Sequence, residues 1–219
     1  MARPISELIN TADPGINLIH EWARDNSEPC EILPPDKGLR SDILLQLQVT
    51  TRSILGAVAY ETGGILALNK RVRILGSGSD RSLLTANGTI GGHSGLLIVG
   101  DDILGGAFAL NGGHFGNEAI GQIYYLAADD LVWTSLDVGY TDFIYCCLTA
   151  DHNLLSRLFL DFESYVQEPP PFDKALSIIP FLWSKESRNG PVSVAVIDAT
   201  EAVNVHIDIA GQLTEEASY

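Results

Sequence analysis

The sequence contains few cysteines and has no long apolar run. The 3 cysteines (Cys30, Cys146 and Cys147) are odd in number and lack metal-type spacing, so neither a zinc site nor a disulfide framework is indicated. No apolar stretch reaches the roughly 18 residues that a membrane-spanning helix needs. The N-terminal residues lack the cationic start and apolar centre of a signal peptide. These absences favour a reduced, cytoplasmic protein.

Positive charge is also scarce. The chain has 13 Lys and Arg residues against 28 Asp and Glu, which gives a formal net charge of −15. A chain with this charge repels phosphate groups, which argues against nucleic acid or an anionic membrane as a partner. The same charge favours fast encounter with a basic protein, although an acidic surface can also serve solubility alone.

The familiar catalytic and cofactor motifs are missing. The 5 histidines form no H-x-x-x-H or H-E-x-x-H pair, and no serine lies in a G-x-S-x-G turn. The Gly-rich stretch 76–95 lacks the Lys-Ser/Thr of a P-loop. His114, beside Gly112-Gly113, is the histidine best placed for chemistry. We therefore expect no enzyme, no cofactor and no metal, although residues that converge only in three dimensions leave an enzyme open.

A series of short strand-like runs occupies the middle of the chain. These runs are rich in β-branched and aromatic residues, and Gly, Asn and Asp separate them, as antiparallel hairpins require. They are Leu96–Val99, Gly106–Leu110, Ile120–Ala127 and Leu131–Leu136. Apolar residues then recur at helical spacing over Tyr140–Thr149, with Cys146 and Cys147 expected as buried thiols. The pattern predicts a β-meander that is closed by a helix.

The flanking segments predict further helices and strands. Helices are expected from Asp13-Pro14, over 36–50, over 153–162 and, with a strand as the alternative, over 198–213. Strands are expected over Ile54–Glu61, Ile65–Leu68, Arg71–Leu75, Ser177–Trp183 and Val192–Ile197. Linkers, loops or turns are expected over 26–35, 76–95 and 187–191. Arg71 and Arg73 should lie on a solvated strand face.

The predicted fold class is α+β, with a mainly antiparallel curved sheet and packed helices. We expect a single domain over residues 1–219, because the length suits one domain. Its parts are N-terminal helices (1–52), a central sheet with a closing helix (53–150) and a C-terminal extension (151–219).

Two aspartate pairs, Asp101-Asp102 and Asp129-Asp130, follow predicted strands. Aspartate is favoured where strands end because its side chain closes turns. A metal site completed by Asn111, Glu118 and Asp137 is an alternative, but neither pair has the spacing of a calcium loop. An interaction surface is the third possibility. Its candidate residues are Asp101, Asp102, Asn111, Asp129, Asp130 and Trp133. An exposed Trp133 could also support a homodimer.

The central pattern resembles the SUKH superfamily, which contains yeast cell-wall-synthesis regulators and many bacterial toxin-immunity proteins. The resemblance rests on Ile98–Leu110, on Gly121–Trp133 and on the helix Tyr140–Leu148. Glu61–Ile65 is similar to an earlier Asn-Gly-Gly turn of that family. The chain as a whole is more similar to an uncharacterised bacterial family of unknown function.

The SUKH resemblance implies an α+β domain that binds proteins, and its immunity members neutralise a cognate toxin by covering it. The leading hypothesis is therefore a non-enzymatic, cytoplasmic protein-binding module, an immunity or regulatory protein whose partner is a basic toxin. The alternative is a small-molecule-binding protein or an enzyme that uses the Gly-rich loops 76–95 and 101–113. A deep pocket lined by Asp101, Asp102, Asn111 and His114 would favour that alternative.

Overall fold

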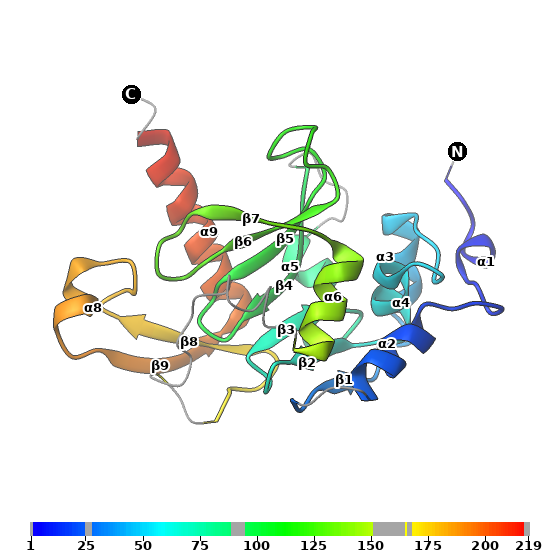
Figure 1. The fold of residues 1–219 in the computed structure, drawn as a ribbon, viewed down its shortest axis with the longest axis horizontal. Helices are drawn as coiled ribbons and strands as arrows, with labels where there is room; N and C mark the ends of the chain where they lie inside the picture. The colour runs from blue at the N-terminus through cyan, green and yellow to red at the C-terminus, as the bar shows by residue number, and fades with distance from the viewer. Residues whose placement is uncertain (1, 25–27, 89–94, 151–164, 166–167, 217–219) are drawn as a thin grey trace.

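The computed structural model has an α+β fold with an antiparallel sheet at its centre, as the sequence predicts (Figure 1). It describes residues 2–24, 28–88, 95–150, 165 and 168–216. The 7 strands of the main sheet follow one another in chain order. They are β1 (Glu31–Leu33), β2 (Gly64–Ala67), β3 (Val72–Leu75), β4 (Leu96–Asp102), β5 (Ala107–Asn111), β6 (Gln122–Leu126) and β7 (Trp133–Gly139).

The predicted meander and closing helix are confirmed by strands β4 to β7 and helix α6 (Tyr140–Thr149). Phe108 of β5 pairs with Tyr125 of β6, and their rings stack with centroids 4.7 Å apart. Phe143 of α6 lies 4.9 Å from Phe108, so the helix closes the apolar face of the meander. Cys146 and Cys147 are buried thiols that form no disulfide, as expected.

The N-terminal helices gather on the α6 side of the sheet (Figure 1). Helix α2 (Ile16–Arg24) contacts α4 (Ile54–Glu61) and α6, while α3 (Arg40–Leu47) joins α4 to a short α1 (Ile5–Leu8). Helix α1 was not predicted, and α3 is shorter than the predicted helix over 36–50. The Asp36 side chain accepts hydrogen bonds from the Gly38 and Leu39 amides, which holds a turn ahead of α3. The predicted linker 26–35 contains β1, which pairs with β2.

The prediction of a strand over Ile54–Glu61 is wrong, because this segment is helix α4. Ser53 caps the helix by accepting a hydrogen bond from the Gly56 amide at 3.1 Å. Gly56 also permits a close approach, since a Cβ there would lie 2.1 Å from the Thr50 carbonyl oxygen. Most of the helix is buried among α2, α3 and α6. A helix covered on all sides is apolar all round, so it lacks the periodicity that separates it from a buried strand.

The solvated face predicted for the strand at Arg71–Leu75 is wrong for Arg73, whereas Arg71, just before β3, is partly exposed. All 4 residues of β3 are buried, and the Arg73 side chain has no exposed surface. The C-terminal part of the chain covers this face, because an Arg73 guanidinium nitrogen donates to the Lys174 carbonyl oxygen. Both faces of β3 are therefore buried. Val72 and Ile74 lie on an apolar face, and Arg73 lies on a polar one.

The segment predicted as a flexible loop, 76–95, contains helix α5 (Leu83–Asn87). Ser82 and Thr85 form a capping box at its start, in which each side chain bonds the backbone of the other residue. Residues 89–94 lie outside the described residues, as does the helix predicted over 153–162.

The C-terminal part forms a separate hairpin and a long helix. Strands β8 (Lys174–Ile179) and β9 (Ser193–Asp198) pair with each other, which confirms the strand predicted over Val192–Ile197. Strand β8 ends before Pro180, so the strand predicted over Ser177–Trp183 is confirmed only over residues 177–179. Residues 187–189 of the predicted turn 187–191 belong instead to helix α8 (Lys185–Asn189). Helix α9 (Ala199–Glu216) packs on both strands and confirms the predicted helix. Asp198 begins it by accepting hydrogen bonds from the Thr200 and Glu201 amides.

Candidate functional site

Asp101 lies in a buried charge cluster at the end of β4. Its carboxylate accepts a hydrogen bond from Arg73 Nε at 2.6 Å and another from Arg81 Nη2. All three side chains are at most 2% exposed. Arg73 also donates to the backbone carbonyl oxygens of Asp102 and Lys174, and Arg81 donates to the Thr200 hydroxyl. The cluster therefore joins the main sheet to β8 and α9, and it leaves no surface of Asp101 for a partner.

Asp102 closes the turn between β4 and β5. Its Oδ1 accepts the Leu104 amide at 2.7 Å and the Gly106 amide at 3.1 Å, and the Tyr125 hydroxyl donates to Oδ2 at 2.7 Å. Burial of the carboxyl raises the pKa of Asp102 to about 6, although these three hydrogen bonds favour the ionised form. Turn chemistry, the first interpretation of this aspartate pair, thus accounts for Asp102.

Asn111 shapes the loop that connects β5 to β6. Its side-chain oxygen accepts hydrogen bonds from the Gly113 and Phe115 amides, and its side-chain nitrogen donates to the Gly116 carbonyl oxygen. Only 1% of Asn111 is exposed. Burial removes Asp101, Asp102 and Asn111 from the predicted contact surface. His114, by contrast, is exposed in the β5–β6 loop.

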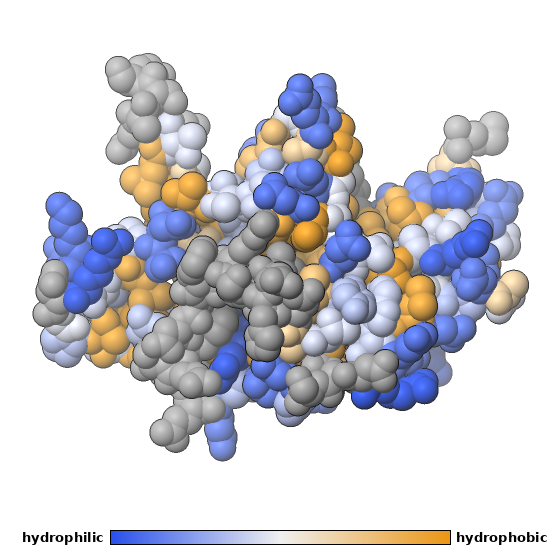
Figure 2. All heavy atoms as spheres, viewed as in Figure 1, coloured by the Kyte–Doolittle hydropathy of each residue, from blue (hydrophilic) through white to orange (hydrophobic). Residues whose placement is uncertain are grey.

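The other predicted residues lie at or next to a groove beside α9. The groove has a volume of about 1210 Å³. Its walls come from the end of α5, the start of β4, the β5–β6 loop, the β6–β7 turn and the outer half of α9. Figure 2 shows a hollow between the projecting end of α9 and the tip of the β5–β6 hairpin. The lining residues that carry the argument below are His114, Phe115, Asp130, Val132, Trp133 and Leu213. We call this surface the α9 groove.

Aromatic side chains stiffen one wall of the α9 groove. The Phe115 ring stacks on Tyr124 with centroids 4.0 Å apart, and it lies 5.5 Å from the ring of Trp133. The amide of Phe115 is held by Asn111, so a buried residue positions an aromatic wall. Val132 and Leu213 remain 56% and 48% exposed at the groove. The buried Asn111 side chain thus affects the groove indirectly, by holding the β5–β6 loop that carries Phe115.

The charge of the α9 groove is negative. Asp130 lines it and is exposed, and no Lys or Arg is among its lining residues. Asp130 also borders a smaller pocket of about 440 Å³, which contains the half-buried Asp129. Burial raises the pKa of Asp129. The geometry thus places Asp130 and Trp133 together at the groove and Asp129 beside it.

The chemical options at the groove are limited by its side chains. His114 and Asp130 are the titratable residues that line it. In the described part of the chain, no group of three or more His, Cys, Asp or Glu side chains is placed to hold a metal ion. None of the described helices has the length and apolarity needed to cross a membrane. An apolar surface with acidic and aromatic edges is suited to the non-covalent binding of another molecule.

The sequence did not reveal that helix α9 forms one side of this site. Leu213 and Val132 are separated by most of the C-terminal part and meet only after α9 folds back along the sheet. The alternation Val203, Val205, Ile207 and Ile209 was the available signal. In the helix it becomes two apolar faces, because Val203 and Ile207 lie one turn apart towards the core and the groove, whereas Val205 lines a different pocket.

Comparison with known proteins finds relatives that cover most of the chain. It is 36% identical to the uncharacterized protein YbfG of Escherichia coli K12 over 199 residues, which is 87% of this chain and 91% of the relative. It is 40% identical to an uncharacterized protein of Haemophilus influenzae Rd over 141 residues, which is 61% of each chain. No solved structure matches. A family model matches residues 5–201, and the chain therefore belongs to the family described as "protein of unknown function DUF2625".

Proposed function

We propose that this protein is a protein-binding module that holds a segment of its partner in the α9 groove. The observation that carries the proposal is the size of the groove. Pockets for small molecules have volumes of roughly 300–1,000 Å³ and enclose most of the ligand. The α9 groove, at about 1210 Å³, is larger and runs along a helix. It fits a stretch of polypeptide better than a metabolite.

The apolar side chains at the groove favour a protein partner. Val132 and Leu213 are each about half exposed, and such side chains are costly to leave in water when they cluster. Phe115 and Trp133 offer rigid aromatic surfaces, the residue class that dominates binding energy at protein interfaces. A partner segment with two or three apolar side chains would bury these surfaces.

Charge selects among possible partners. The chain carries a net charge of −15, and Asp130 lies at the groove. A basic partner would be attracted over several ångströms and would approach faster at low salt. The central sequence pattern resembles that of SUKH proteins, many of which neutralise toxins, and on this resemblance we propose an immunity role within the cytoplasm with a basic toxin as the partner.

A matched pair of variants tests this proposal. Leu213→Asp places a charge in the groove, whereas Leu18→Asp places the same charge on α2, at a leucine of similar exposure (48% and 46%). The tagged wild type and both variants are used for pull-down from native host lysate at low and moderate salt, with quantitative mass spectrometry. We expect a basic protein to be retained at low salt by the wild type and Leu18→Asp, and to be lost with Leu213→Asp. Equal retention by all three proteins would refute the groove as the binding surface.

The immunity role needs its own test. A toxin encoded by a neighbouring gene is expressed with the wild type, with Leu213→Asp or with Leu18→Asp. Growth should be rescued by the wild type and Leu18→Asp and not by Leu213→Asp. If the wild type gives no protection against the retained partner, the partner is not a toxin that this protein neutralises.

A further inference from the structure

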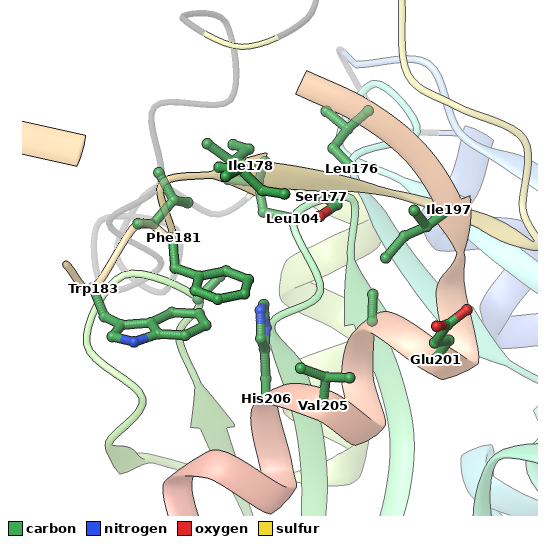
Figure 3. A pocket seen from close by; sticks show the side chains of 14 residues that line it. Leu104, Leu176, Ser177, Ile178, Phe181, Trp183, Ile197, Glu201, Val205 and His206 are labelled. Atoms are coloured by element: carbon green, nitrogen blue, oxygen red, sulfur yellow. The ribbon is translucent and has the colours of Figure 1, made fainter. Parts of the chain in front are cut away.

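Whereas the α9 groove is lined by the outer half of α9, a second, smaller pocket is lined by its first half. It has a volume of about 240 Å³ and is enclosed by the β8–β9 hairpin, the segment after Pro180, the β4–β5 turn and the first half of α9. Its lining is apolar for the most part, with Leu104, Leu176, Ile178, Ile197 and Val205 around it (Figure 3). We call it the His206 pocket.

Two parallel aromatic rings form one side of the His206 pocket. The rings of Phe181 and Trp183 stack with centroids 4.4 Å apart and an interplanar angle of 7°. Figure 3 shows the imidazole of His206 beside their edges, and the His206 and Trp183 rings meet edge to face at 5.2 Å. Phe181 remains 41% exposed, so the pocket opens to solvent along this side. The edges of two parallel rings and the apolar side chains around them favour an aromatic ligand, which packs well edge to face.

The orientation of His206 gives the pocket a ring-nitrogen acceptor, in addition to the oxygens of Ser177 and Glu201 that also line it. His206 Nδ1 lies 2.9 Å from the Gly105 carbonyl oxygen, which can only accept, so Nδ1 carries the hydrogen. Burial lowers the pKa of His206, which keeps the ring neutral near pH 7. The other nitrogen, Nε2, then bears a lone pair that can accept a hydrogen bond. Gly105 permits this contact, since a Cβ there would lie 3.1 Å from the imidazole ring.

We propose that the His206 pocket binds a small aromatic molecule that carries one hydrogen-bond donor, such as a phenol or an indole. A cavity of about 150 Å³ is sufficient for benzene in a protein core, so about 240 Å³ accommodates a substituted or bicyclic ring. The ring lies against Phe181 and Trp183, and its O–H or N–H donates to His206 Nε2. This site is separate from the α9 groove and does not depend on the proposed partner.

Matched fluorinated probes test the ligand class without any variant. 4-Fluorophenol and 4-fluorotoluene have similar shapes, but only the phenol can donate a hydrogen bond. Binding of each probe to the full chain is followed by ¹⁹F NMR titration. We expect saturable binding of both, with the phenol about three- to tenfold tighter, as one hydrogen bond in an apolar site provides. Absence of saturable binding, or equal affinity of the two probes, would overturn the proposal.

Two variants locate the binding site. His206→Phe keeps an aromatic ring and removes the acceptor, so the preference for the phenol should disappear while the toluene still binds. Ser177→Phe fills the pocket from β8, where a half-buried residue can be enlarged without disturbing the core. It should abolish binding of both probes, with folding checked by circular dichroism. Unchanged binding to folded Ser177→Phe would show that the probes bind elsewhere and would refute the site.

Discussion

The buried carboxyl of Asp102 should make the stability of the protein depend on pH in an unusual direction. Its pKa is about 6 in the folded protein, against 3.8 when unperturbed. The folded state therefore binds the proton more tightly than the unfolded state does. The stability that protonated Asp102 provides is fully present below about pH 4 and is lost as the pH rises through about 6.

The size of this effect follows from the difference in pKa. A difference of about 2 units at about 1.4 kcal/mol per unit corresponds to about 3 kcal/mol of unfolding free energy between acidic and neutral pH. The perturbation is Asp102→Asn, which has nearly the same shape but does not ionise. The asparagine oxygen can still accept the Leu104 and Gly106 amides, and its nitrogen can donate to the Tyr125 hydroxyl oxygen.

Urea denaturation at pH 4, 5, 6 and 7 measures the difference in unfolding free energy between Asp102→Asn and the wild type. This difference should shift in favour of the variant by about 2–3 kcal/mol from pH 4 to pH 7, while groups common to both proteins cancel. The variant Tyr125→Phe keeps Asp102 but removes a hydrogen bond to its ionised carboxylate, which raises the pKa of Asp102 further. The pH at which stability is lost should therefore be higher in Tyr125→Phe than in the wild type. A difference that does not change with pH, or that shifts in the opposite direction, would refute the reasoning.

Three further predictions concern packing and reactivity. Asp101→Asn leaves Arg73 and Arg81 without their shared carboxylate, and urea denaturation should show a loss of about 3–5 kcal/mol; a loss below about 1 kcal/mol would show that the cluster is not a stabilising unit. Ser53→Ala removes the cap of α4 and should cost about 1 kcal/mol by the same method, whereas an unchanged midpoint would mean that the cap is replaced. Thiol labelling of the native protein at pH 8 should modify the partly exposed Cys30 first, because Cys146 and Cys147 are buried and burial raises the pKa of Cys147; early labelling of Cys147 would contradict its burial.

The parts of the fold that sequence reasoning predicted are those in which local pattern and tertiary environment agree. Strands β4 to β7 have one helix-covered face and turns made of Gly, Asn and Asp, so both signals point to a meander. Helix α6 has a buried stripe with exposed Tyr145 on its other side. In α9, the Asp198 cap and the helical spacing outweigh the short alternation of valine and isoleucine.

The errors arise where distant segments cover a surface. Helix α4 is covered on all sides, so its sequence lacks a polar face. Arg73 sits in a strand with an apparently solvated face, but Asp101 and the backbone of β8 supply its partners. Neither partner can be identified from residues adjacent to Arg73 in the sequence. A buried arginine needs such partners, and they come from segments about 30 and 100 residues away.

Coverage by distant segments also explains why sequence reasoning named only some residues of the proposed binding surface. Asp130 lies in the β6–β7 turn and Trp133 begins β7, where polar and aromatic residues are normally accessible, and both line the α9 groove. Asp101, Asp102 and Asn111 lie at the ends of β4 and β5, but they are buried because their side chains bond the backbone and buried groups around them. The opposite wall of the groove, including Leu213, depends on the return path of α9.

The most direct test of the proposed binding surface is hydrogen exchange of this protein with and without the basic partner retained in the pull-down. Occupation of the α9 groove should slow exchange in the β5–β6 loop (112–121) and the β6–β7 turn (127–132), which form its walls. Exchange in α1 and α2, on the far side of the sheet, should remain unchanged. Slower exchange confined to the N-terminal helices, with the two loops unaffected, would contradict binding in the groove.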